Sequence, residues 1–69
     1  MPLSFSPAGS VVSVKAIKGR DEVRRFLESL GFVVGSRVTV VSEISGNLIV
    51  NVKDSRVAIS KGMASRIMV

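Results

Sequence analysis

The side chains that most often carry catalysis or hold transition metals are largely missing from this chain. Its 69 residues include no Cys and no His, so thiolate chemistry, imidazole base catalysis, disulfide bonds and the common zinc, copper and iron ligand sets are absent. The eleven serines are scattered, and none lies in the pattern of a nucleophile elbow. We therefore predict a protein that is not an enzyme, with no catalytic residues and no cofactor.

Carboxylates are the only remaining candidates for a metal site, and there are five of them. Three lie close together in one predicted helix, but two of these are adjacent and point apart, with arginines between them and the third. Ferrous iron prefers at least one imidazole or a tight set of carboxylates. We therefore predict no metal site and expect the carboxylates to balance neighbouring arginines. The five are Asp21, Glu22, Glu28, Glu43 and Asp54.

Basic side chains outnumber acidic ones by ten to five, which gives a net charge of +5. This charge suggests attraction to a nucleic acid, a membrane surface or an acidic protein, although it could also serve solubility alone. The densest basic run could dock on an acidic protein or on lipid head groups, or it could be a solvated helix face. It comprises Lys15, Lys18, Arg20, Arg24 and Arg25. We predict that all of these except Lys15 contact a partner.

Three consecutive apolar residues, Phe32, Val33 and Val34, link two predicted elements. A connecting loop is normally polar, so an apolar link is either folded into the core or kept for a partner. Both possibilities remain open, and we include the three residues among the predicted partner contacts. Ile49 and Met68 face away from the predicted core and could extend a patch or support a homo-oligomer.

The elements that position these residues are mainly strands. Val and Ile number 18 against 8 for Leu and Ala together, and β-branched side chains pack well on a pleated surface. Tight turns are expected at residues 45–47 and at residues 54–55. Alternation of apolar residues predicts inward-facing side chains at Val12, Val14, Val38, Val40, Leu48, Val50 and Val52. The predicted strands cover residues 10–17, 36–44 and 48–53, a segment around Val57 and Ile59, and residues 66–69.

One longer helix, about residues 21–30, is predicted after the first strand, with Asp21 or Gly19 as its cap. Gly31 should end it, because a left-handed residue commonly follows a helix. Ser60 should cap a one-turn helix over residues 61–65. The longer helix has one apolar face, at i, i+3, i+4 and i+7 spacing, made of Val23, Phe26, Leu27 and Leu30.

Together these elements predict a mainly β fold, a small closed or partly closed barrel of five or six short strands. Closure removes the sheet edges that so much valine would otherwise expose. We expect residues 1–69 to form a single domain in which Leu3 and Phe5 fold back onto the core. No apolar stretch approaches the ~18 residues of a membrane span. Residues 1–14 lack the basic start of a signal peptide, so we expect a cytoplasmic protein.

Two segments carry a family pattern. Residues 30–40, LGFVVGSRVTV, are similar to a core of the form L-G-(three residues)-G-x-x-V-x-V, and residues 55–69 are similar to a closing block in which Ala is followed by x-I-x-V. Residues 2–4 and 9–17 are also similar, so the chain resembles the FeoA family over nearly its whole length. Members of that family are small cytoplasmic accessory proteins of ferrous iron transport. Val34 departs from the pattern, which commonly has Pro at this position.

The resemblance implies an SH3-like β-barrel and a non-catalytic accessory or regulatory protein. Its implied partner is the cytoplasmic region of the FeoB-type ferrous iron permease. One alternative is a metal-responsive, transition-metal-binding domain, because a similar SH3-like domain forms part of metal-dependent repressors. The other is a small basic barrel that binds nucleic acid. Nucleic acid is the less favoured partner, because we expect no phenylalanine to be free to stack on bases.

Overall fold

The structure, a computed structural model, describes all of residues 1–69. It contains six β-strands, two α-helices and one short 3-10 helix. In chain order these are η1 (Leu3–Phe5), β1 (Val11–Ser13), β2 (Ala16–Ile17), α1 (Asp21–Ser29), β3 (Arg37–Ile44), β4 (Asn47–Val52), β5 (Ser55–Ser60), α2 (Lys61–Ala64) and β6 (Ile67–Met68).

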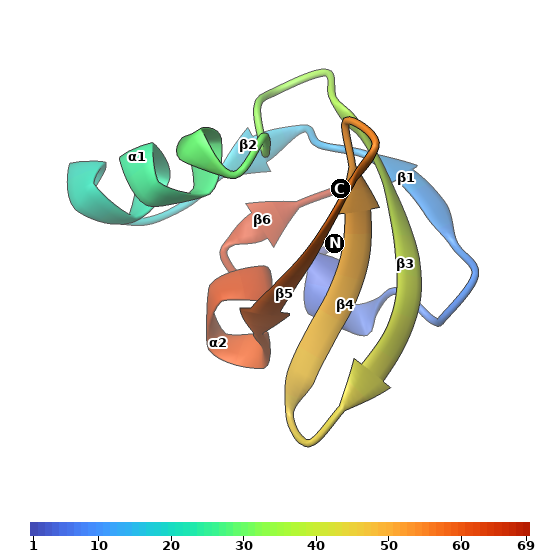
Figure 1. The fold of residues 1–69 in the computed structure, drawn as a ribbon. Coiled ribbons are helices and arrows are strands. Elements are labelled where there is room, and N and C mark those ends of the chain that lie inside the picture. The colour runs from blue at the N-terminus through green and yellow to red at the C-terminus, as the bar shows by residue number, and fades with distance from the viewer.

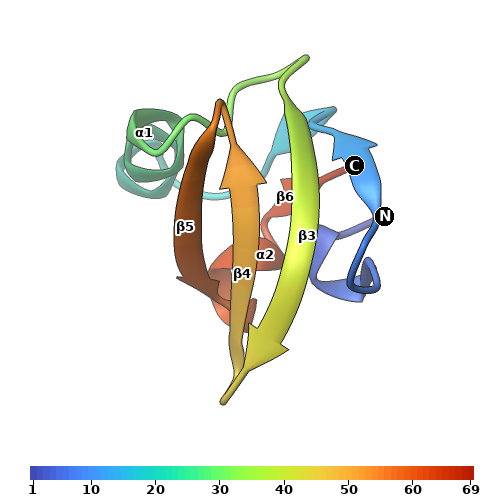
Figure 2. The ribbon, with the colours of Figure 1, turned by 45° about the vertical axis from the view of Figure 1, so that its right-hand side comes forward.

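The strands form two antiparallel sheets. The larger has the order β1-β3-β4-β5, and the smaller pairs β2 with β6. Figures 1 and 2 show β3, β4 and β5 as long curved strands, with η1, α2 and β6 on their concave side. This arrangement confirms the predicted mainly β fold, with a one-turn helix before the last strand.

The core lies between the two sheets and follows the predicted alternation. Twelve apolar residues are buried in one cluster, among them all the inward-facing residues predicted for β3 and β4. Valine and leucine on one face of each strand therefore supply most of the burial that stabilises this small protein. The residues predicted correctly in these two strands are Val38, Val40, Leu48, Val50 and Val52.

Strand β3 contains a β-bulge that the alternation did not predict. Val40 pairs with Val50 and Ser42 pairs with Ile49, so Val41 is an extra residue. Residues beyond a bulge change faces relative to strict alternation. As a result Glu43 pairs with Leu48 and lies on the inner side of the sheet, near its end.

The predicted strand over residues 10–17 is divided in two. Strand β1 pairs with β3, whereas β2 pairs with β6 in the other sheet. Between them the N–H of Val14 donates to Ser36 O at 2.9 Å and the N–H of Lys15 donates to Met68 O at 2.7 Å. The chain thus turns a barrel corner at these two residues and stays hydrogen-bonded as it changes sheets.

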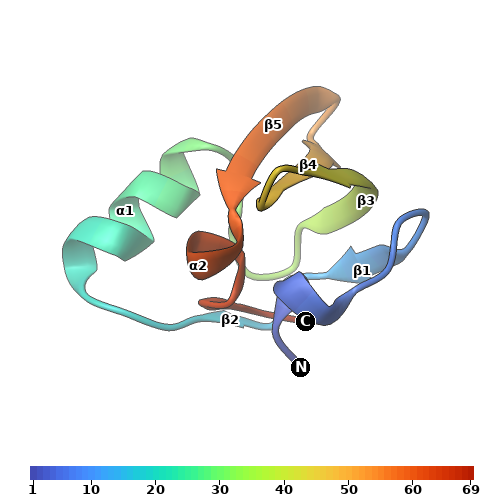
Figure 3. The ribbon, with the colours of Figure 1, turned by 90° about the horizontal axis from the view of Figure 1, so that it is seen from below.

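Helix α1 ends as predicted, because Gly31 follows it with a φ of 106°. Its predicted cap is wrong: Arg20 holds the N-cap position in extended backbone and makes no side-chain cap hydrogen bond. The face of α1 that packs against the barrel also contains fewer residues than the apolar face that was predicted. Leu27 is fully buried, but Phe26 is 50% exposed. Figure 3 shows why, since α1 lies beside the barrel and projects away from it.

The first turn lies within the predicted range, and the second lies one residue earlier than predicted. Positive φ falls at Ser45 and Gly46 between β3 and β4, and at Lys53 and Asp54 between β4 and β5. The predicted cap of the short helix is confirmed, because the N–H of Met63 donates to Ser60 Oγ at 3.2 Å. Neither α-helix combines the length and apolar character needed to cross a membrane.

Candidate functional site

The carboxylates do not form a metal centre. No three acidic side chains come together anywhere in the chain, which also has no His or Cys. One of the five, Glu43, forms the only ion pair of the molecule, with its Oε1 2.7 Å from Lys61 Nζ. The carboxylates were expected to balance nearby arginines, but none of them forms a direct ion pair with an arginine.

The apolar link divides between core and surface. The Phe32 side chain is fully buried, and its N–H donates to Leu27 O at 3.0 Å, so it has no surface left for a partner. Val33 is half-buried, whereas Val34 is 69% exposed at a turn. Gly35 holds this turn on the barrel through its N–H, which donates to Val14 O at 2.8 Å. Only Val33 and Val34 remain available as predicted contacts.

The four predicted basic contacts are all exposed. Lys18 and Arg20 lie where the chain leaves β2 and enters α1, and Arg24 and Arg25 lie on α1 itself. None of them has a carboxylate partner, since the molecule has only the one ion pair. Their charge is therefore available to an anionic surface.

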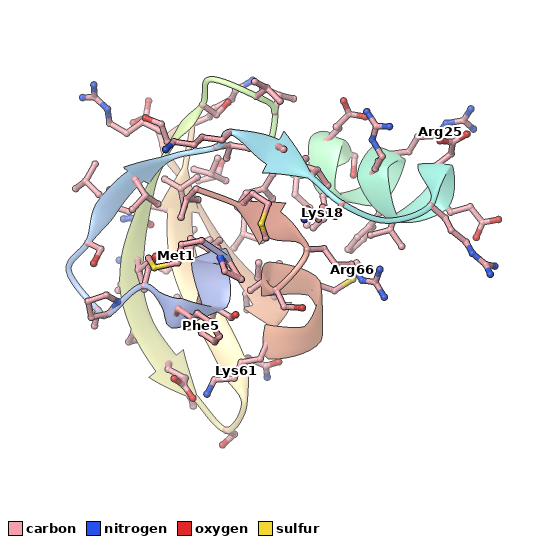
Figure 4. All side chains as sticks on the ribbon, turned by 180° about the vertical axis from the view of Figure 1, so that it is seen from behind. Met1, Phe5, Lys18, Arg25, Lys61 and Arg66 are labelled. Carbon is pink, nitrogen blue, oxygen red and sulfur yellow. The ribbon has the colours of Figure 1, made fainter.

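A fifth cation, Arg66, joins this group from the other end of the chain. The backbone N–H of Lys18 donates to Arg66 O at 2.7 Å. The guanidinium Nη1 of Arg66 lies 3.1 Å from the position that a Cβ would take on Gly19. The lack of a side chain at Gly19 therefore leaves room for Arg66. Figure 4 shows Lys18 and Arg66 on the same side of the molecule, with Arg25 farther out on α1. We call Lys18, Arg20 and Arg66 the basic corner.

Two of the three phenylalanines lie at the surface, which corrects an expectation from the sequence. Phe5 is 72% exposed because η1 directs Leu3 into the core and Phe5 outward. Phe26 is half exposed on α1. An aromatic ring is therefore exposed in two places, and Phe5 is labelled in Figure 4. Ile49 and Met68 are half-buried, so neither adds a large apolar patch.

A second group of cations lies on the outer face of the large sheet, and sequence reasoning did not find it. The register places Thr39 opposite Asn51 and Asn51 opposite Arg56 across three strands. Arg37 and Lys53 lie nearby, around a shallow depression of about 510 Å³. Only the strand register brings these residues together, so spacing along the chain gave no signal. The depression is lined by Ser36, Arg37, Thr39, Asn51, Lys53 and Asp54.

The same barrel fold is found in solved structures of small SH3-like proteins. One is the FeoA of Stenotrophomonas maltophilia complexed with zinc, described as a procaryotic SH3 domain protein. It is 30% identical, with a TM-score of 0.85 over 99% of this chain and 87% of the other. The chain thus has an SH3-like fold, as the resemblance implied.

The particular family follows from three further matches. The FeoA domain model matches residues 1–69. A crystal structure of an iron uptake regulatory protein, also FeoA, is 36% identical, with a TM-score of 0.91 over 97% of this chain and 89% of that one. "Putative Fe(2+) transport protein A" of Methanocaldococcus jannaschii is 37% identical over 68 residues, 99% of this chain and 83% of the relative. The chain belongs to the FeoA family of accessory proteins of ferrous iron transport.

Proposed function

We propose that this protein is a non-catalytic cytoplasmic regulator of ferrous iron transport that contacts the cytoplasmic region of a FeoB-type permease. In this proposal residues 1–69 act as one FeoA-like domain. The observation that carries it is the match of the FeoA domain along the whole chain, together with a relative named for Fe(2+) transport.

The surface of α1 supports contact with a protein. Phe26 is half exposed there, next in sequence to Arg24 and Arg25, and the basic corner lies at the start of the same helix. Aromatic and arginine side chains are enriched where protein interfaces bury the most free energy. A helix that projects from the barrel can also reach a groove in a partner. We therefore assign the contact to α1 and the basic corner.

The test is binding of the purified soluble cytoplasmic region of the permease, measured by calorimetry at moderate salt. We expect the double variant Arg24→Glu/Arg25→Glu to bind at least about tenfold more weakly, because charge-paired contacts contribute about 1.5–3 kcal/mol each. The matched control is Arg37→Glu/Arg56→Glu. It changes the net charge by the same amount on the outer face of the large sheet. Equal weakening by both variants, or no binding by the unaltered protein, would contradict the proposal.

Nucleic-acid binding is a second candidate, favoured by the two exposed phenylalanines. The exposed rings of Phe5 and Phe26 could stack on unpaired bases while exposed lysines and arginines contact phosphates. A gel shift with single-stranded RNA tests it. Binding that falls steeply with salt and is lost in Phe5→Ala/Phe26→Ala would support it, whereas the absence of a shift at low salt would exclude it.

A further inference from the structure

A concave feature of the molecular surface lies outside the region assigned to the permease. It is the depression on the outer face of β3 and β4, beside the turn at Lys53 and Asp54. Its volume of about 510 Å³ lies within the roughly 300–1,000 Å³ typical of small-molecule sites. No hydrophobic side chain lines it. The polar ends of the lining side chains would therefore make the specific contacts with a ligand.

Hydrogen-bond donors dominate this depression. Arg37 contributes a guanidinium, Lys53 an ammonium, Thr39 a hydroxyl and Asn51 an amide. The single carboxylate of the lining belongs to Asp54. Since neither cation is in an ion pair, both are free to bind an anion. The lining therefore carries a net charge of +1.

A third cation adds to the positive charge around the depression. Arg56 lies opposite Asn51 in the register of β4 and β5, on the same face of the sheet. Asn51 in turn lies opposite Thr39, and Arg37 is two residues earlier on the same strand, which places it on the same face. The three cations thus surround two neutral donors. Strands hold Arg37 and Arg56, which makes their positions more precise than positions on loops, and Lys53 lies in the turn that follows β4.

We propose that this depression binds a small molecule that carries two or more linked phosphates. Phosphate oxygens accept hydrogen bonds from arginine in a forked geometry, and lysine and hydroxyl donors complete such sites. A single phosphate would leave most of the volume to water. An acidic peptide spreads single charges along its backbone, whereas linked phosphates place a denser charge against the three cations. The linked phosphates can belong to a free oligophosphate or to the tail of a nucleotide.

The experiment is a titration of the intact protein with tripolyphosphate at constant ionic strength, followed by calorimetry and by the NMR shifts of backbone amides. We expect shift changes centred on Arg37, Thr39, Asn51 and Lys53. The double variant Arg37→Gln/Lys53→Gln should weaken binding at least about tenfold, because it removes two charge-assisted hydrogen bonds. Arg24→Gln/Arg25→Gln removes the same charge from α1 and should leave the affinity within about twofold.

A parallel titration with a nucleoside triphosphate distinguishes the two sources of phosphate. Equal affinity would show that the protein contacts only the phosphate chain, and tighter binding would show that the nucleoside is contacted as well; either result supports the site. Equal losses in both double variants would overturn it as a net-charge effect. Tighter binding of a glutamate-rich peptide of the same charge, or shifts centred elsewhere, would also overturn it. The four substituted side chains are exposed, so each variant is expected to fold, and circular dichroism checks this.

Discussion

Leu27 and Phe26 are neighbours on α1, yet only Leu27 is enclosed by the barrel. Truncating a fully buried leucine costs about 2–5 kcal/mol, so Leu27→Ala should lower the free energy of unfolding by about 3 kcal/mol. Full burial of a phenylalanine contributes about 1.5–3 kcal/mol, so its half exposure leaves about 1 kcal/mol to lose. Alanine's better helix propensity returns roughly half of that. Phe26→Ala should therefore lower the free energy of unfolding by less than Leu27→Ala does, although phenylalanine is the larger side chain.

The assay is urea and thermal unfolding followed by far-ultraviolet circular dichroism, because the chain has no Trp or Tyr for fluorescence. For a domain of this size each kcal/mol shifts Tm by about 4–8 °C. Leu27→Ala should thus lower Tm by roughly 12–24 °C and Phe26→Ala by less than about 8 °C. If Leu27→Ala does not fold, Leu27→Met keeps the volume and should cost less than about 1.5 kcal/mol.

The two variants also test how α1 lies on the barrel. If Phe26→Ala destabilises the protein as much as Leu27→Ala, then Phe26 is part of the core and the helix is rotated from the position described. In that case α1 would not offer an aromatic side chain to a partner, and the assignment of the permease contact to this helix would fail. A stable Phe26→Ala variant that binds the permease region more weakly would support both conclusions.

Two further substitutions test local structure by the same unfolding measurements. Ser60→Ala removes the hydroxyl that accepts the Met63 N–H, so we expect a loss of about 1 kcal/mol; no loss would show that the cap is not stabilising. Ser45 and Gly46 both have positive φ, as in a type I′ turn, for which Asn-Gly is preferred. Ser45→Asn should therefore raise Tm by a few degrees, and a lower Tm would contradict that turn geometry.

The elements that the sequence predicted well are those with local causes. Leu48, Val50 and Val52 alternate strictly, and a strand buried on one face requires that period. Gly31 ends α1 because its positive φ is open to glycine at little cost. Ser60 caps α2 because its hydroxyl reaches an N–H three residues later. Each of these signals lies within a few residues, so no knowledge of tertiary structure was needed.

The features that were missed depend on tertiary packing. Nothing in the sequence marks Val14 and Lys15 as the place where the chain changes sheets, because their hydrogen-bond partners, Ser36 and Met68, are remote in sequence. The spacing of Phe26 is that of a core residue. Its exposure follows from the narrow contact between the helix and a small barrel. Arg66 joins the basic corner only because β6 pairs with β2.

The bulge at Val41 changes the charge on the outer face of the large sheet in a way that strict alternation would not show. By alternation, Glu43 would share the outer face with Arg37 and Thr39 and would add a carboxylate to it. The extra residue places Glu43 opposite Leu48 instead, where it pairs with Lys61 at 2.7 Å. The bulge therefore removes an anion from the outer face and neutralises a cation on α2. One backbone irregularity thus makes the outer face of the large sheet more positive as a whole.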